Sequence, residues 1–82
     1  MNFEEANKTE HPVEKQWHYP ILTKHGFVAV TKVGTGFVRT YTYEHPDGRA
    51  IQCNTGVSSD YWTDLGTKEF GYWAALEKHI SR

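Results

Sequence analysis

Histidine and cysteine have the most versatile chemistry in this 82-residue chain, which holds five histidines and one cysteine. His11, His18 and His25 are seven residues apart, a spacing that would stack them on one face of a helix. Pro12 and Pro20 argue against a continuous helix here, because proline removes a backbone hydrogen bond and clashes with the preceding turn. The spacing therefore does not predict a metal site.

A wider set of potential ligands adds His45 and Cys53. The sequence has no Cys-x-x-Cys or His-x-x-x-His pair, the close spacings that zinc sites use. Cys53 could instead act as a nucleophile, with His45 or His18 as its base. Its expected place on the packed face of a strand argues against this, since a buried free cysteine usually behaves as a small hydrophobe. We therefore expect no metal, no cofactor and no enzymatic activity.

Two weaker patterns also have simpler explanations. Residues 33–36 contain Gly-x-Gly but lack the third glycine and the following helix of a phosphate-binding loop, so a turn accounts for them. Asp60 and Asp64 are four residues apart and could form a carboxylate pair. Capping of a helical turn and solvation explain them more simply.

A β-hairpin over residues 36–56, joined at Pro46-Asp47-Gly48, is the best determined element. Pro46 has the φ that a type I turn needs, and Gly48 can adopt the positive φ of a G1 bulge. This turn sets Tyr43 opposite Ile51 and Tyr41 opposite Cys53, with His45 opposite Gly48 and Arg49. The packed face then carries Arg39, Tyr41, Tyr43, Ile51 and Cys53. The other face carries Val38, Thr40, Thr42, Glu44, Ala50, Gln52 and Asn54.

The segments around this hairpin predict its neighbours. Residues 27–32 are rich in β-branched side chains and form a third strand, which completes an antiparallel meander. The segment Ser58-Ser59-Asp60 can cap a short helical turn over residues 61–65, and Thr67 can cap a second helix from Lys68 to about Ser81. Its sheet-facing side chains are Phe70, Trp73, Leu76 and Ile80, which close over the packed face together with Trp62.

The N-terminal segment is predicted to be irregular. Residues 1–10 form a flexible tail, and residues 11–26 form an extended arm with a short edge strand around residues 16–19. The fold class is thus α+β: a three-stranded antiparallel meander packed against a C-terminal helix, with an extended N-terminal arm. Residues 11–82 form a single small domain.

The composition excludes several functional classes. The net charge of −1 falls far short of the excess in a dedicated nucleic-acid-binding protein. No apolar run is long enough to span a membrane, and the acidic start is not a signal peptide. The single cysteine cannot form an internal disulfide, so we expect a reducing, cytoplasmic location.

Surplus aromatic residues are the main functional signal. Trp17, Tyr19, Tyr61, Trp62 and Tyr72 cannot all be buried in so small a domain, and Trp and Tyr are strong anchors at interfaces. We therefore expect a non-enzymatic protein-interaction module that uses the first four of these residues. An open strand edge beside them would suit a partner strand, or a second copy in a homodimer.

The alternative is a weak single-stranded nucleic-acid-binding protein. Aromatic and basic residues interleave between residues 17 and 43, as they do in proteins that stack bases and contact phosphates. The cations in this stretch are Lys24, Lys32 and Arg39, which are few for phosphate contacts. This reading therefore ranks second.

Two segments resemble small uncharacterised proteins of bacteriophages and prophages. They are Glu10-His11-Pro12-Val13-Glu14-Lys15-Gln16-Trp17-His18-Tyr19-Pro20 and Phe70-Gly71-Tyr72-Trp73. The resemblance covers most of the chain and brings no activity and no residue roles with it. It implies an accessory factor that binds host or phage machinery.

Overall fold

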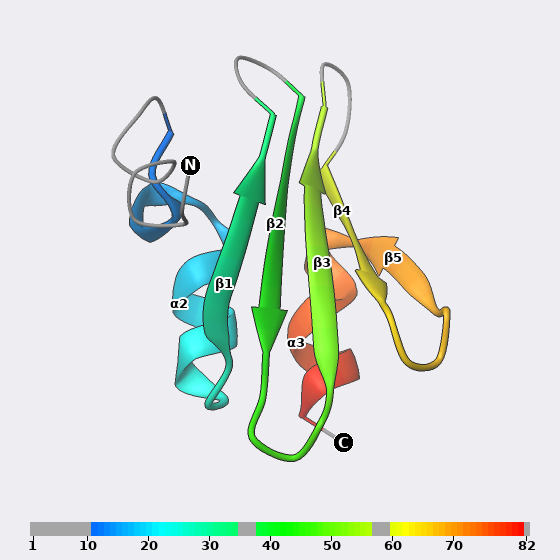
Figure 1. The fold of residues 1–82 in the computed structure, drawn as a ribbon. Coiled ribbons are helices and arrows are strands. Elements are labelled where there is room, and N and C mark those ends of the chain that lie inside the picture. The colour runs from blue at the N-terminus through cyan, green and yellow to red at the C-terminus, as the bar shows by residue number, and fades with distance from the viewer. Residues whose placement is uncertain (1–10, 35–37, 57–59, 82) are drawn as a thin grey trace.

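Five antiparallel strands form one sheet in the computed structural model, which describes residues 11–34, 38–56 and 60–81 (Figure 1). Each strand pairs with the next along the chain. The strands are β1 (Val28–Val33), β2 (Arg39–Glu44), β3 (Ala50–Thr55), β4 (Asp60–Asp64) and β5 (Phe70–Tyr72). The α+β class is confirmed, but the predicted three-stranded sheet is too small.

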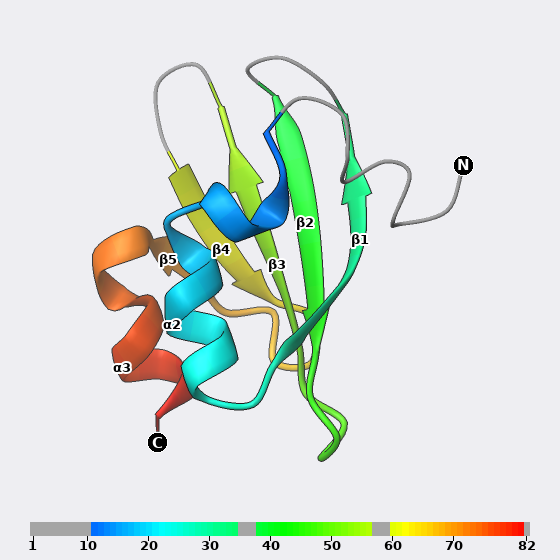
Figure 2. The same ribbon diagram turned by 90° about the vertical axis from the view of Figure 1, so that its left-hand side faces the viewer.

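The two α-helices of the described residues lie against the same face of this sheet, as the edge-on view shows (Figure 2). The helical elements are η1 (Val13–Lys15), α2 (His18–Lys24), η2 (Trp73–Ala75) and α3 (Leu76–Ile80). We call the face that they cover the covered face, and the opposite one the open face. No described element packs on the open face (Figures 1 and 2).

The β2–β3 hairpin has the predicted register. Tyr43 pairs with Ile51 and Tyr41 with Cys53, and all four side chains are buried on the covered face. Gly48 has a φ of 98°, and its N–H donates to the His45 carbonyl at 2.9 Å. This positive φ is the one that the three-residue turn needs and that glycine adopts without strain.

The third predicted strand is also confirmed, with a shift of one residue. β1 pairs with β2 and contains a bulge at Val30, between Ala29 and Thr31. The turn predicted after it falls partly outside the described residues, because 35–37 are not described.

The segment after the hairpin forms strands where helix was predicted. Residues 61–65 do not form a helical turn capped by Asp60, since β4 occupies Asp60–Asp64. Buried Trp62 and Asp64 alternate with more exposed neighbours, which is the period-two pattern of a half-buried strand. Lys68 has a φ of 68°, a left-handed conformation that a helix cannot continue through.

The C-terminal helix is present but much shorter than predicted. α3 begins at Leu76, and Leu76 and Ile80 are buried as expected. Phe70 and Trp73, which were predicted to pack with them, are exposed, because Phe70 belongs to β5 and Trp73 to η2.

The extended arm predicted for residues 11–26 is wrong, and so is its edge strand around 16–19. This segment forms η1 and α2. Pro20 is the third residue of α2, where a backbone N–H has no partner within the helix, so proline is tolerated there. The predicted tail, residues 1–10, lies outside the described residues.

The hydrophobic core fills the space between the covered face and the helices. It contains Val13, Leu22, Phe27, Tyr41, Tyr43, Ile51, Cys53, Trp62, Leu76 and Ile80. Every described element except β1, β5 and η2 contributes at least one of these residues, and Phe27 immediately precedes β1. Tyr41 and Tyr43 are the largest fully buried side chains, which explains how a small domain fills its core with few aliphatic residues.

Candidate binding surface

The open face is built by the strand residues that alternate with core residues. Its members, taken from the pairing of the five strands, are Val28, Thr31, Val33, Thr40, Thr42, Glu44, Ala50, Gln52, Asn54, Tyr61, Thr63, Phe70 and Tyr72. Glu44 is the only one of these residues that is charged at neutral pH. A wet sheet face usually carries more charge, so this depletion distinguishes the open face.

Aromatic residues gather at the β4–β5 end of the open face. Tyr61, Phe70 and Tyr72 are 41%, 75% and 68% exposed, and Tyr61 pairs directly with Tyr72. Together with Gly71 they line a hollow of about 310 Å³. We call these three side chains and their hollow the aromatic end. Contiguous apolar patches of this kind mark interaction sites, whereas single exposed rings do not.

Trp62 holds β5 in place from the covered face. Its indole N–H donates to the Tyr72 carbonyl at 2.9 Å. The ring also lies against Gly71, where an added Cβ would stand only 3.0 Å from a ring carbon of Trp62. A larger residue than glycine at this position would therefore push β5 away from the indole and move the aromatic end.

The turn between β4 and β5 is fixed by Asp64. Its carboxylate accepts the N–H groups of Gly66 and Thr67, at 2.9 and 3.1 Å, and lies 2.8 Å from His79 Nε2. Burial alone would raise the pKa of Asp64, but the hydrogen bonds from His79, Thr67 and Gly66 outweigh it and hold the pKa below its ordinary value. The His79 ring in turn lies 4.4 Å from the Trp62 ring, so the turn and β5 share one support.

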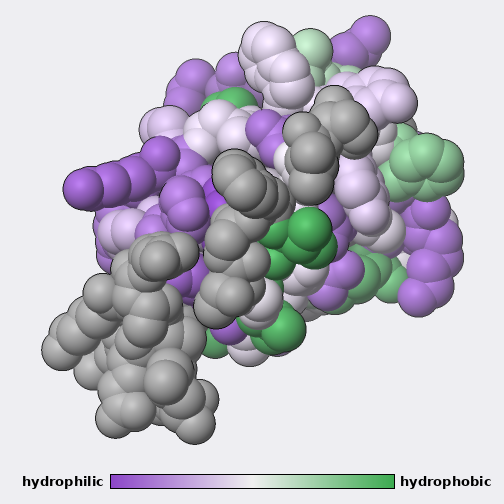
Figure 3. All heavy atoms as spheres, turned by 90° about the horizontal axis from the view of Figure 1, so that it is seen from above, coloured by the Kyte–Doolittle hydropathy of each residue, from purple (hydrophilic) through white to green (hydrophobic). Residues whose placement is uncertain are grey.

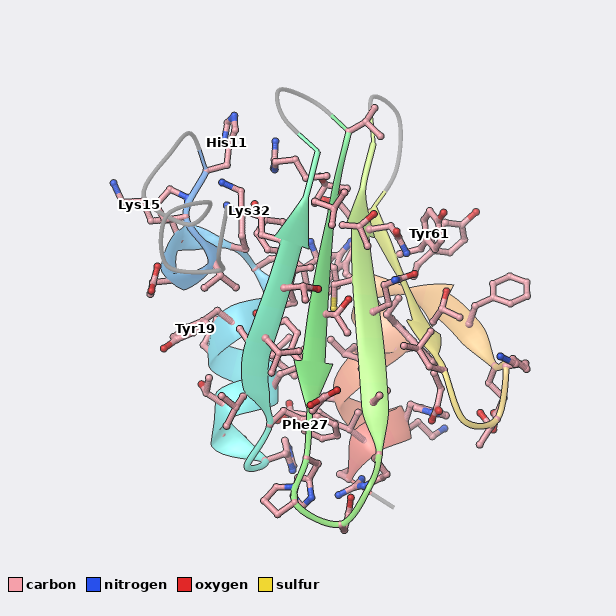
Figure 4. The ribbon with its side chains drawn as sticks, in the orientation of Figure 1. His11, Lys15, Tyr19, Phe27, Lys32 and Tyr61 are labelled. Carbon is pink, nitrogen blue, oxygen red and sulfur yellow. The ribbon has the colours of Figure 1, made fainter. Side chains whose placement is uncertain are left out.

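The four predicted contact residues do not form one site. Figure 4 shows Tyr19 on α2 at one side of the molecule and Tyr61 near β4 at the other. Trp17 immediately precedes α2, and Trp62 is only 3% exposed, so Trp62 is a core residue and cannot touch a partner. Of the four, only Tyr61 belongs to the aromatic end.

Sequence reasoning placed Phe70 in the core. The signal that could have corrected this is the alternation Phe70-Gly71-Tyr72, in which two rings flank a glycine at strand spacing. In the structure both rings point to the open face and Gly71 faces Trp62.

The three cations of the nucleic-acid alternative also lie apart from the aromatic end. Lys24 forms an ion pair with Glu77 at 3.0 Å, and Lys32 is buried. Arg39 donates to the Tyr41 hydroxyl at 3.0 Å on the covered face. Figure 4 labels Lys15 and Lys32 near the β1 edge of the sheet, whereas Tyr61 lies near the opposite edge. No described cation lies on the open face, where phosphates of a stacked strand would need one.

The candidate nucleophile Cys53 is completely buried in the core. Burial raises the pKa of its thiol well above the ordinary value, so it stays protonated near neutral pH. Its two candidate bases are held elsewhere. His45 lies in the hairpin turn against Asp47, and His18 Nδ1 lies 2.7 Å from the Tyr43 hydroxyl. Within the described residues, no group of three or more metal-ligating side chains occurs.

Cys53 provides a direct test of this packing. In the native protein we expect its thiol to react with a thiol reagent such as DTNB about a hundredfold more slowly than in the urea-unfolded chain, because the reaction requires an opening of the core. The release of the coloured thiolate, followed at pH 8 with and without urea, measures both rates. Equal rates in the two states would contradict the burial of Cys53.

Seen from the end at which β1 and β3 finish, hydrophobic surface forms separate areas with hydrophilic residues between them (Figure 3). No one apolar area therefore dominates the described residues that this view shows. None of the helices in the described part of the chain has the length and apolar character needed to cross a membrane.

Comparisons of the chain with protein-family models, curated proteins and solved structures found no match. Its function must therefore be argued from the open face itself.

Proposed function

We propose that this protein is a non-enzymatic module that binds a partner protein through the aromatic end of its open face. The observation that carries the proposal is the exposure of Tyr61, Phe70 and Tyr72 around one hollow, on a face with a single charged residue. Cores of protein interfaces are likewise depleted of charge and enriched in aromatic residues. A partner's apolar side chain would fill the hollow and remove the three rings from water.

Contact through side chains is better supported than addition of a partner strand. β5 has only three residues, and its Tyr72 carbonyl already accepts the Trp62 indole N–H. At the other edge, β1 contains a bulge at Val30 and directs Lys32 to the covered face. A short strand, a bulge and an inward charge are features that protect sheet edges from pairing. Our proposal therefore omits the strand-edge homodimer expected from the sequence.

We propose no catalytic role, because the candidate reactive groups among the described residues have structural roles. Cys53 is buried, and the Asp64–His79 pair fixes the β4–β5 turn. We place the module in a reducing compartment such as the cytoplasm because of its single cysteine. The resemblance to phage and prophage proteins supports a partner in phage or host machinery.

The aromatic end can be tested with matched variants. Wild-type protein and the variants Phe70→Ala/Tyr72→Ala and Val28→Ala are immobilised and exposed to the same cell lysate. Val28 is exposed on the same face but lies at its β1 edge, opposite Glu44, so it controls for loss of apolar surface. We expect the Val28→Ala variant to capture a partner as wild type does, and the aromatic variant to capture at least about tenfold less.

Equal capture by all three proteins would contradict the proposal, as would a folded wild type that neither captures a partner nor associates with itself. A titration with labelled single-stranded oligonucleotides at 50 and 200 mM salt addresses the alternative. Binding that weakens steeply with salt would favour nucleic acid over a protein partner.

A further inference from the structure

The side chains of the open face project less at its β1 edge than at its β5 edge, and we call these the low edge and the high edge. Two rows of side chains cross all five strands, as the pairing registers show. The first row is Val33, Thr40, Asn54, Tyr61 and Tyr72, and the second is Thr31, Thr42, Gln52, Thr63 and Phe70. Both rows begin with small β-branched residues on β1, hold an amide on β3 and end with a ring on β5. The face is therefore low at β1 and high at β5.

We propose that the open face packs against the open face of a second copy, about a two-fold axis parallel to β3. This inference rests on the proposed function and names the partner as the same chain. Such an axis places β5 of each copy over β1 of the other. Tyr72 and Phe70 then cover Val33 and Thr31 of the second copy, so that the high edge of each copy meets the low edge of the other. Aligned sheets pack about 10 Å apart in this manner.

The alternative two-fold axis, across the strands, is less favourable. It would stack β5 on β5 and β1 on β1, so that rings meet rings at one edge. At the other edge, small side chains would face each other across a gap, which loses packing contacts. The grading of the face thus selects the axis parallel to β3.

The polar residues of the face suit this axis too. Because β3 lies on the axis, Asn54 and Gln52 each face the same residue of the second copy. An amide carries both donors and acceptors, so it can pair with itself across a two-fold axis. Asn54 Oδ1 already accepts the Thr40 hydroxyl at 2.9 Å, which leaves its NH₂ group to donate across the axis. Glu44 lies at the end of the face, next to the hairpin turn, where solvent reaches it.

The size of the face predicts a weak association. The strands are three to six residues long and about 4.8 Å apart, which gives roughly 400 Å² from each copy. The total of about 800 Å² is below that of standard specific interfaces. We therefore expect dissociation in the micromolar range or above, so that a dilute sample is monomeric.

Sedimentation equilibrium between about 5 and 500 µM tests the proposal. Wild type is expected to shift from the 9.5 kDa monomer towards twice that mass as concentration rises. Asn54→Asp and Asn54→Lys each place two like charges across the axis, so each variant alone should dissociate at least about tenfold more readily than wild type. A mixture of the two variants should associate again, because opposite charges then face each other.

This rescue by mixing is specific to an axis at Asn54. Circular dichroism confirms that each variant is folded, and Phe70→Ala is a second variant that lowers the high edge without touching the core. A wild type that stays monomeric at 500 µM, or a dimer that tolerates both Asn54 variants, would overturn the inference. Capture of a different protein by a monomeric wild type would overturn the inference that the partner is a second copy, but the proposed function would stand.

Discussion

Lowering the pH from 7 to 4.5 is expected to reduce the free energy of unfolding by about 2–3 kcal/mol, chiefly through His18. His18 is completely buried between α2 and the sheet, with its ring centre 4.9 Å from that of Tyr41. Burial, assisted by the nearby charge of Arg39, lowers the pKa of His18 from 6.5 to about 3. At pH 4.5 His18 therefore stays neutral in the folded protein, whereas it binds a proton in the unfolded chain.

The direction of this effect follows from proton binding. Below pH 6.5 the unfolded chain binds a proton at residue 18, and the folded protein does not until about pH 3. The stability is fully present above pH 6.5 and is lost progressively as the pH falls towards 3. Burial keeps Tyr43 protonated by raising its pKa, so its hydroxyl can donate to neutral His18. The one proton of neutral His18 is then on Nε2, which has no hydrogen-bond partner within the described part of the chain, and a second proton would have to enter at Nδ1, where Tyr43 already donates.

Carboxylates are protonated at lower pH than the imidazole of an unfolded chain, so their effect on stability can be separated from that of His18. Hydrogen bonds from Lys24 and His25 lower the pKa of Glu77, and those at Asp64 lower the pKa of that residue. Their contributions are lost only as the pH falls below about 4. The window from pH 6.5 to 4.5 therefore reports mainly on His18.

Urea unfolding followed by tryptophan fluorescence at several pH values measures the effect. In the variant His18→Phe/Tyr43→Phe, both hydrogen-bonding partners become apolar at similar shape, so the fold should survive and the loss between pH 6.5 and 4.5 should largely disappear. His11→Asn is the control, because His11 is exposed and asparagine tolerates its φ of 60°. An unchanged pH dependence in the double variant would show that His18 is not the group responsible.

Local turn chemistry determined the part of the fold that the sequence predicts well. Pro46 and Gly48 define a turn whose geometry requires no distant contact, and the register follows from it as far as Tyr41 and Cys53. In the same way, the alternation along β2 and β3 assigned the covered and open faces correctly.

The C-terminal third depends on distant contacts that no local window contains. Leu76 and Ile80 do follow helical spacing, but Phe70 and Trp73 extend the same spacing by coincidence. What makes residues 70–72 a strand is the Trp62 ring, which packs against Gly71 and bonds the Tyr72 carbonyl. Tertiary packing of this kind overrides local preference.

The candidate surface was predicted only in part, again because it depends on contacts with distant strands. Tyr61 and Trp62 are adjacent, and nothing local in the sequence indicates which of the two side chains is exposed. Both were predicted to contact a partner. The pairing of Trp62 with Cys53 turns it to the covered face and turns Tyr61 to the open face. A strand register thus separates adjacent residues into core and surface, and it is set by the partner strand.

Replacing Leu76 with alanine is expected to lower the free energy of unfolding by about 2–5 kcal/mol, the range for removing a fully buried leucine side chain. α3 has only five residues and would not form in isolation, so its position depends on the burial of Leu76 and Ile80. Native proteins have free energies of unfolding of about 5–15 kcal/mol, so the variant loses a large part of its stability.

Trp73→Ala is the matched comparison, because a single helix from Lys68 to Ser81 would bury Trp73 and Leu76 alike. The structure leaves Trp73 59% exposed on η2, so its replacement should change stability by less than about 1 kcal/mol. Urea unfolding at pH 7, followed by circular dichroism so that the lost tryptophan does not affect the signal, compares the two variants. Similar losses for both would favour the long helix, whereas a loss confined to Leu76→Ala places the start of the covering helix after β5.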